Sequence, residues 1–222
     1  MTGCPFSSAR PERQQARSEA KRTRLIEAGI AAFGTHGYEG ASLRDIAKRS
    51  GAGLAAVSYH FGGKRELYLA CAAQIAENVR GVTASVRAAL ATQAPPLARV
   101  EAALEATVRN ILQEKPQQDW PRFFMRCEAE DAEAFGIIFE GALSEIIAGL
   151  THALSETPMA RLGEDELRFR IGALIIMCFS LRSHSNFGFA ALGQGPGERD
   201  RPEALALRLK RLYLPELMDQ AT

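Results

Sequence analysis

SLRDIAKRSGAGLAAVSYHFGGKREL, residues 42–67, contains two short helical segments joined by a glycine-rich turn. Ser42 and Asp45 form a capping box, in which the hydroxyl accepts a free helix N–H and the carboxylate reaches back. Gly51 and Gly53 allow the backbone angles of a sharp turn between helices. The pattern predicts a helix-turn-helix, the arrangement that places a recognition helix in the major groove of DNA.

The second helical segment is predicted over residues 54–60. Its first residues are small, which suits a helix end that approaches base edges and phosphates closely. Val57 and Phe61 are expected to face inward. After two glycines, the ammonium of Lys64 is placed to neutralise a phosphate. The predicted DNA-contacting residues are Ser42, Arg44, Gly53, Leu54, Ala55, Ser58, Tyr59, His60 and Lys64.

Each of these residues also has an ordinary structural interpretation, which the sequence leaves open. Tyr59 and Phe61 fit a hydrophobic core as well as a DNA surface. His60 fits an exposed position without a role, and Lys64 fits a solvated surface charge. A Ser-x-x-Asp box by itself starts helices in every kind of protein.

Together, these residues and the segments around them resemble the tetracycline-repressor (TetR) family of bacterial regulators, over roughly residues 20–68. Two stretches, AAVSYHFGGKRELYLAC and FFMRCEAED, are most similar to the CecR-like branch. The chain departs from the family pattern at Gly53, where a Ser or Thr cap is usual, and at Ser58, where many members carry an aromatic residue. The positions that carry the resemblance are Ile26–Ala28, Phe33, Gly37, Tyr38, Ser42–Ala47, Gly51, Tyr59–Phe61 and Lys64–Tyr68.

The resemblance implies an all-α fold, with a three-helix DNA-binding domain followed by a larger helical domain that binds a ligand and dimerises. It implies a homodimer on a pseudo-palindromic operator, and a repressor that a small organic effector releases. A relative of the same fold whose body binds a protein partner is the alternative. A filled core in place of a cavity would favour that alternative.

Charge is distributed unevenly along the chain. Residues 1–68 contain eleven Lys or Arg against six Asp or Glu, a net charge of +5. The remaining residues contain sixteen against twenty, a net charge of −4. A basic N-terminal part on an acidic body is typical of a protein that binds DNA through one end only.

Composition limits the other classes of protein. The 222 residues have ample apolar content for one large or two modest domains. Four cysteines stand far apart, without a CxxC pair or a histidine at ligand spacing, so no disulfide, metal site or cofactor is predicted. The N-terminus lacks the apolar core of a signal peptide, and the apolar run 171–181 is too short to span a bilayer. A cytoplasmic protein without a membrane role is expected.

Three parts of the chain are predicted. Residues 1–17 form a flexible basic arm, and Arg13, Arg17 and Lys21 are placed to reach the minor groove. A merely disordered tail is the alternative interpretation of the residues before Arg13. Residues 18–66 form the helix-turn-helix domain, and residues 67–222 form the regulatory and dimerisation domain. Apolar spacing and helix breakers predict helices over residues 18–34, 64–90, 97–114, 120–131, 133–155, 164–187 and 201–219.

The segments 164–187 and 201–219 are the predicted dimer surface. The first is apolar on nearly all sides, so it needs cover from two directions: its own domain and a two-fold mate. A helix buried within one subunit is the alternative interpretation.

An effector pocket is predicted where aromatic residues concentrate, between residues 120 and 135. Aromatic walls with one or two polar groups suit a small organic ligand, although the same residues can form an ordinary core. The candidate effector-binding residues are Trp120, Phe124, Arg126 and His184. An enzyme with Cys127 or Cys71 as nucleophile and His184 or His152 as base is not predicted, because no catalytic order or spacing supports it.

Overall fold

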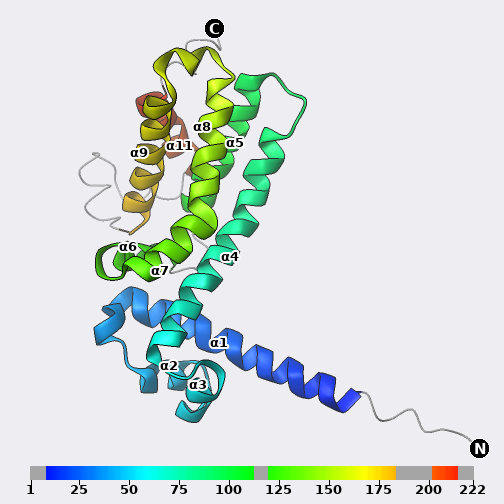
Figure 1. Ribbon diagram of the computed structural model, residues 1–222, viewed down its shortest axis with the longest axis vertical. Coiled ribbons are helices and arrows are strands. Elements are labelled where there is room, and N and C mark those ends of the chain that lie inside the picture. The colour runs from blue at the N-terminus through cyan, green and yellow to red at the C-terminus, as the bar shows by residue number, and fades with distance from the viewer. Residues whose placement is uncertain (1–8, 113–119, 184–201, 215–222) are drawn as a thin grey trace, which may run out of the picture.

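The computed structural model (Figure 1) describes residues 9–112, 120–183 and 202–214. Within these ranges the chain is helical and contains no strand, which confirms the predicted all-α fold. The elements are α1 (Ala9–Gly40), α2 (Leu43–Arg49), α3 (Leu54–Phe61), α4 (Lys64–Leu90), α5 (Pro96–Leu112), α6 (Trp120–Glu130), α7 (Ala132–Ile138), the π-helix η1 (Phe139–Leu143), α8 (Ser144–Ser155), the 3₁₀-helix η2 (Pro158–Leu162), α9 (Glu164–Ser183) and α11 (Pro202–Tyr213).

Helices α1 to α3 and the first turns of α4 form a small head at one end of the molecule (Figure 1). Leu25, Phe33, Ile46 and Val57 are all buried, so every helix of the head contributes to its core. Leu67 joins this core from α4, which then continues into the body. One long helix therefore connects the two parts of the molecule.

The local signals of the helix-turn-helix act largely as predicted. The Ser42 hydroxyl accepts a hydrogen bond from the Asp45 backbone N–H at 3.4 Å and caps α2. Gly51 has φ +68°, a conformation that L side chains rarely adopt, so the turn requires glycine there. Gly53 is extended, with φ −81° and ψ 159°, and the turn does not require glycine at this position.

Helix α1 differs from the prediction at both ends. It begins at Ala9, so the described part of the predicted flexible arm is helical. It does not end at Gly34: the chain kinks at Gly37 (φ 72°, ψ 178°) and continues as helix to Gly40. The kink places Tyr38 against the ring of Tyr68, with centroids 5.1 Å apart.

The body packs α5, α8 and α9 together beside α4. Residues 132–155 run as one helical rod through α7, η1 and α8, close to the predicted 133–155. This rod is long and apolar enough to cross a membrane by length and composition. However, Ile138, Leu150 and Leu154 are fully buried against the rest of the body, as in the core helix of a helical domain. The predicted ends of the last two helices, at 187 and 219, lie outside the described residues.

Candidate nucleic-acid interface and effector cavity

The outer face of α3 is open to solvent. Leu54 and Tyr59 are 44% and 81% exposed, and Ala55 and Ser58 are also exposed. Helical spacing places these four side chains on one face, while Val57 points into the core. The core interpretation of Tyr59 is therefore wrong. Phe61 is half-buried, with the Arg22 guanidinium 5.4 Å from its ring centroid.

The remaining predicted DNA contacts lie around this face or support it. Arg44 and Gly53 are exposed. The Ser42 hydroxyl is also exposed, although it caps α2. The ring of His60 is half-buried and lies 5.0 Å from that of Tyr59.

Lys64 begins α4 and bonds within the head. Its ammonium donates a hydrogen bond to the Glu39 carbonyl oxygen at 3.1 Å and lies 4.9 Å from the ring centroid of Tyr38. An ammonium has three donors, so a phosphate contact remains compatible with these interactions. The structure adds a role that the sequence did not indicate, because Lys64 ties the end of α1 to the start of α4.

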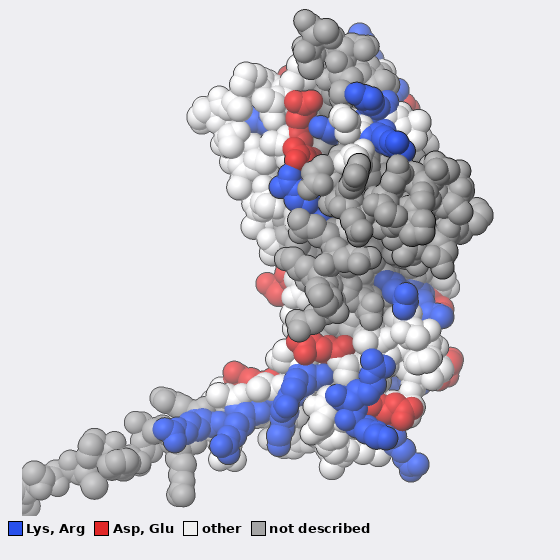
Figure 2. All heavy atoms as spheres, turned by 180° about the vertical axis from the view of Figure 1, so that it is seen from behind, with Lys and Arg blue, Asp and Glu red and all other residues white. Residues whose placement is uncertain are grey.

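Basic side chains gather at the head end of the molecule. Figure 2 shows Lys and Arg over the head and along the part of α1 that projects from it. A polyanion approaching this end meets a positive surface, whereas the body carries the net negative charge. The α3 face and the positive surface together form the candidate nucleic-acid interface.

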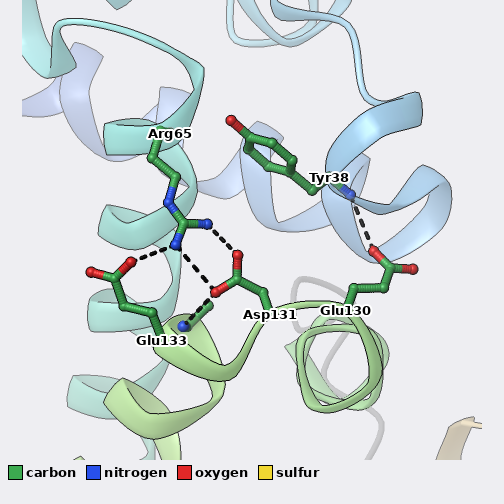
Figure 3. A network of polar contacts seen from close by, with 6 residues as sticks. Tyr38, Arg65, Glu130, Asp131 and Glu133 are labelled. Carbon is green, nitrogen blue, oxygen red and sulfur yellow. Dashed lines mark hydrogen bonds and ion pairs between the residues drawn. The ribbon is translucent and has the colours of Figure 1, made fainter.

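A polar cluster joins the head to the body where α6 ends and α7 begins (Figure 3). Arg65 of α4 pairs with both Asp131 and Glu133. Asp131 also caps α7, because its carboxylate accepts the Ala134 backbone N–H at 2.9 Å. The Arg65 guanidinium lowers the pKa of the Asp131 carboxyl below its ordinary value, and the pKa of Arg65 is raised in turn by its two partners.

Arg126 and Glu130 of α6 complete this junction on the α1 side. The Arg126 guanidinium donates to the carbonyl oxygens of Gly34 and Thr35 at 3.0 and 3.1 Å, and to Glu130 at 2.9 Å. Glu130 accepts the Tyr38 backbone N–H at 3.4 Å (Figure 3). Sequence reasoning did not identify this junction, and the FFMRCEAED segment was its only signal.

The body contains a cavity of about 380 Å³, a size that suits a small organic molecule. Its wall includes a row of phenylalanines in which Phe179, Phe124, Phe135 and Phe139 follow one another, with ring centroids 5.2 to 5.5 Å apart. Its other lining residues are Met125, Glu128, Leu143, Ile147, Arg168, Gly172, Ile175 and Ile176. The wall is thus mainly aromatic and aliphatic, with one carboxylate and one guanidinium.

The structure brings only part of the predicted effector set to this cavity. Phe124 lines it. Trp120 stands behind the wall, edge-on to Phe179 with centroids 5.3 Å apart. Arg126 was expected at the pocket but is turned toward α1, because its guanidinium satisfies two carbonyls at the kinked end of that helix. His184 lies outside the described residues.

The cysteines of the described ranges are structural. Burial raises the pKa of the Cys127 thiol to about 12 and that of Cys178 to about 12, and it also raises the pKa of Cys71. Thiols with such pKa values are not nucleophiles at neutral pH. His152 is an exposed side chain 3.8 Å from Glu156. Across the described residues, His, Cys, Asp and Glu form no group that could hold a metal ion.

Comparison with known proteins finds similarity to a family of regulators in the N-terminal part of the chain. The model of the family described as bacterial regulatory proteins, tetR family, matches residues 25–71. The HTH-type transcriptional dual regulator CecR of Shigella flexneri is 30% identical over 146 residues, which cover 63% of this chain and 65% of CecR. The HTH-type transcriptional repressor AcnR of Corynebacterium glutamicum is 28% identical over 99 residues, 45% of this chain and 44% of AcnR.

The solved structures agree over more of the length. A TetR-like transcriptional regulator from Rhodococcus sp. RHA1 superposes with a TM-score of 0.64, covering 89% of this chain and 96% of that one, at 17% identity. This likeness shows the fold. The chain spans slightly less than two thirds of CecR and less than half of AcnR. CecR and AcnR are both transcriptional regulators, in agreement with the prediction of a protein that is not an enzyme.

Proposed function

We propose that this chain, whose residues 25–71 match the model of the tetR family of bacterial regulators, is a homodimeric repressor. The dimer binds a pseudo-palindromic operator, and a small organic effector in the body releases it. The observation that carries the proposal is the open face of α3, where Tyr59 is 81% exposed beside a basic surface.

The exposed α3 residues supply the contacts that a recognition helix needs. Ala55 is small and lies in the first turn, so the backbone can approach base edges closely. Ser58 and Tyr59 offer hydroxyl groups to phosphates or bases. Arg44 and the basic side chains of α1 supply the electrostatic attraction. AcnR is a repressor and CecR a dual regulator, and the first of these supports the sign proposed here.

The dimer proposal is supported by apolar side chains on the outside of the body. Phe169 and Ile176 of α9 are 70% and 66% exposed, and Leu212 of α11 is 67% exposed. Both helices fall in the segments predicted for dimerisation, 164–187 and 201–219. Removing such large apolar groups from water is favourable, and a second copy of the same surface is the partner that two-fold symmetry supplies.

The cavity supports a small organic effector over the alternative of a protein partner. Its 380 Å³ are enclosed mainly by aromatic and aliphatic side chains, as in binding sites for small organic molecules. Three of its lining residues, Phe124, Met125 and Glu128, lie on α6, the helix whose Arg126 contacts the head. A ligand that favours another position of α6 would thereby change the position of the head.

The proposal is tested by titrating fluorescent DNA from the region upstream of the protein's own gene, with excess nonspecific DNA present. Wild-type protein should bind tightly as a dimer. Tyr59→Ala should weaken specific binding about tenfold to hundredfold without changing stability, since the side chain is exposed. Arg161→Ala, an exposed basic residue in η2 of the body, is the matched control and should bind normally. Equal binding by Tyr59→Ala and the control would contradict the assignment of α3.

The oligomeric state is tested separately. The double variant Phe169→Asp, Leu212→Asp should sediment as a monomer at concentrations where the wild type is a dimer, because charges are costly in an apolar interface. The monomer should keep its helical circular dichroism and lose affinity for the full operator. A double variant that still sediments as a dimer would exclude this surface as the interface.

A further inference from the structure

The N-terminal part of α1 projects beyond the head. Among the side chains of this helix that the structure describes, from Arg13 onward, Leu25 is the first that is buried, and those from Arg13 to Arg17 are exposed. Figure 1 shows this part of α1 leaving the head as a straight helix beside α3. Within it, Gln15 donates a hydrogen bond to the Glu19 carboxylate at 3.3 Å. A polar helix that packs on no core gains no stability from burial in its own domain. A binding role outside the domain would explain why it is there.

Three basic residues of this projecting helix form a row. Arg13, Arg17 and Lys21 are spaced four residues apart, which places their side chains on one face at intervals of about 6 Å. Like charges at this spacing destabilise a helix. The row is therefore unfavourable for the free protein and becomes favourable against a polyanion. Figure 2 shows the resulting line of basic side chains along α1.

A groove of about 750 Å³ separates the projecting helix from α3. Arg17 and Lys21 lie on its α1 wall, and Tyr59 and His60 lie on its α3 wall. The rest of the lining is small or polar: Gln14, Gln15, Ser18, Ala55 and Ala56. The Arg22 guanidinium of α1 lies 5.4 Å from the ring centroid of Phe61 of α3, so the two helices also touch beside the groove.

We propose that this groove, called here the α1–α3 groove, holds the sugar-phosphate backbone of one DNA strand beside the major groove that α3 enters. Arg13, Arg17 and Lys21 then contact successive phosphates from one side, and Tyr59 and His60 contact the strand from the other. The proposal rests on the proposed function, since it requires α3 on DNA. It corrects the predicted flexible arm: these residues act as a rigid helix on the backbone.

The chemistry of the groove favours a phosphate backbone. Guanidinium, ammonium, hydroxyl and amide groups are the side chains that proteins use against phosphates. The alanines Ala55 and Ala56 leave room for a strand to lie against α3. An acidic protein segment would meet the same charges, so it is the competing outcome of the test.

The experiment measures the affinity of the full chain for operator DNA at several salt concentrations. The slope of log K against log salt reports the number of phosphates neutralised, at about 0.9 per contact on duplex DNA. The triple variant Arg13→Ala, Arg17→Ala, Lys21→Ala should lower the magnitude of this slope by about five, because each subunit of the dimer loses three phosphate contacts. Each single variant should weaken binding about two- to tenfold on operator and nonspecific DNA alike. Arg161→Ala should leave the slope unchanged.

Footprinting of the DNA backbone distinguishes a DNA strand from an acidic protein segment as the occupant of the α1–α3 groove. Hydroxyl-radical cleavage should show protected sugars beside each half-site in the wild-type complex, and the triple variant should lose only that protection. A triple variant with the wild-type slope and footprint would overturn the proposal. An acidic protein segment would then be the remaining candidate partner of the basic row. Tight, competitor-resistant operator binding by the wild type, with the wild-type slope retained in the triple variant, would preserve the proposed function and refute the α1–α3 groove as a DNA site.

Discussion

Helices α3 and α6 are both short and both carry aromatic and polar side chains, yet they use these side chains in opposite ways. On α3, Ser58 and Tyr59 face solvent. On α6, Arg126 donates to two carbonyls of α1, while Phe124 lines the cavity. The first helix is open to another molecule, whereas the second ties the head to the body. Recognition and its control thus belong to different helices.

The largest expected effect on DNA affinity is that of a substitution that prevents α3 from contacting DNA. Ala55→Glu places a carboxylate in the exposed first turn of α3, where it would face phosphates. Because juxtaposed like charges cost several kcal/mol, operator affinity should fall at least about hundredfold in a binding titration. The free energy of unfolding should change by less than about 0.5 kcal/mol.

The matched change on α6 is Arg122→Glu, at an exposed position of that helix. It should leave operator affinity nearly unchanged. If the two variants bound DNA alike, the distinction between the helices would be lost.

At the junction, Asp131→Ala should lower the free energy of unfolding by about 1–3 kcal/mol, because it removes both the α7 cap and the pair with Arg65. Asp131→Asn keeps a capping oxygen, so it should lower the free energy of unfolding by about half as much. Urea unfolding of both variants separates the two contributions. Equal losses would show that the cap contributes little.

The same pair predicts a pH dependence. The folded-state pKa of Asp131 lies below its ordinary value of 3.8. Its contribution to stability is therefore fully present above that ordinary value and is lost as the pH falls through the lowered pKa. The difference in unfolding free energy between wild type and Asp131→Asn should shrink as the pH is lowered from 6 toward about 3. A difference that stayed constant across this range would argue against the Arg65 pair.

A smaller effect is expected for Arg126→Met, which keeps the bulk of the side chain but removes its hydrogen bonds to α1. Two lost bonds should cost about 1–2 kcal/mol of unfolding free energy. DNA affinity without effector should change less than in Ala55→Glu, and the loss of binding caused by an effector should be reduced. If an effector released this variant from DNA as fully as it releases the wild type, α6 would act on the head through other contacts.

The smallest effect is expected for Gly53→Ser. Gly53 is the N-cap of α3 without a capping side chain, and no atom lies within 4 Å of a Cβ placed there. A serine hydroxyl can cap α3, which should stabilise the head by a few tenths of a kcal/mol. Thermal unfolding should show a slight rise in midpoint. A fall would show that α3 requires the uncapped start.

The head was predictable because its structure depends on neighbours in the sequence. The Ser42 cap, the positive φ of Gly51 and the buried Val57 all follow from patterns a few residues long. The all-helical body was also predictable from apolar spacing and helix breakers. The beginning of α1 was not, because its polar residues suit a flexible arm as well as a helix.

The junction was not predictable, because its partners are far apart in sequence. Arg126 and the Gly34 carbonyl are 92 residues apart, and an arginine among aromatics suits a ligand pocket equally well. The kink at Gly37 turns carbonyls and the Tyr38 N–H toward α6, and this orientation decides where Arg126 and Glu130 bond.

Short-range chemistry therefore determined the helices, the cap and turn of the helix-turn-helix, and the basic character of one end. The packing of distant helices decided that Arg126 binds α1, that Phe124 lines a cavity with Phe179, and that Arg17 faces Tyr59 across a groove. The physical reason is that a side chain's rotamer and partners depend on the surfaces brought against it. Those surfaces exist only after the helices have packed.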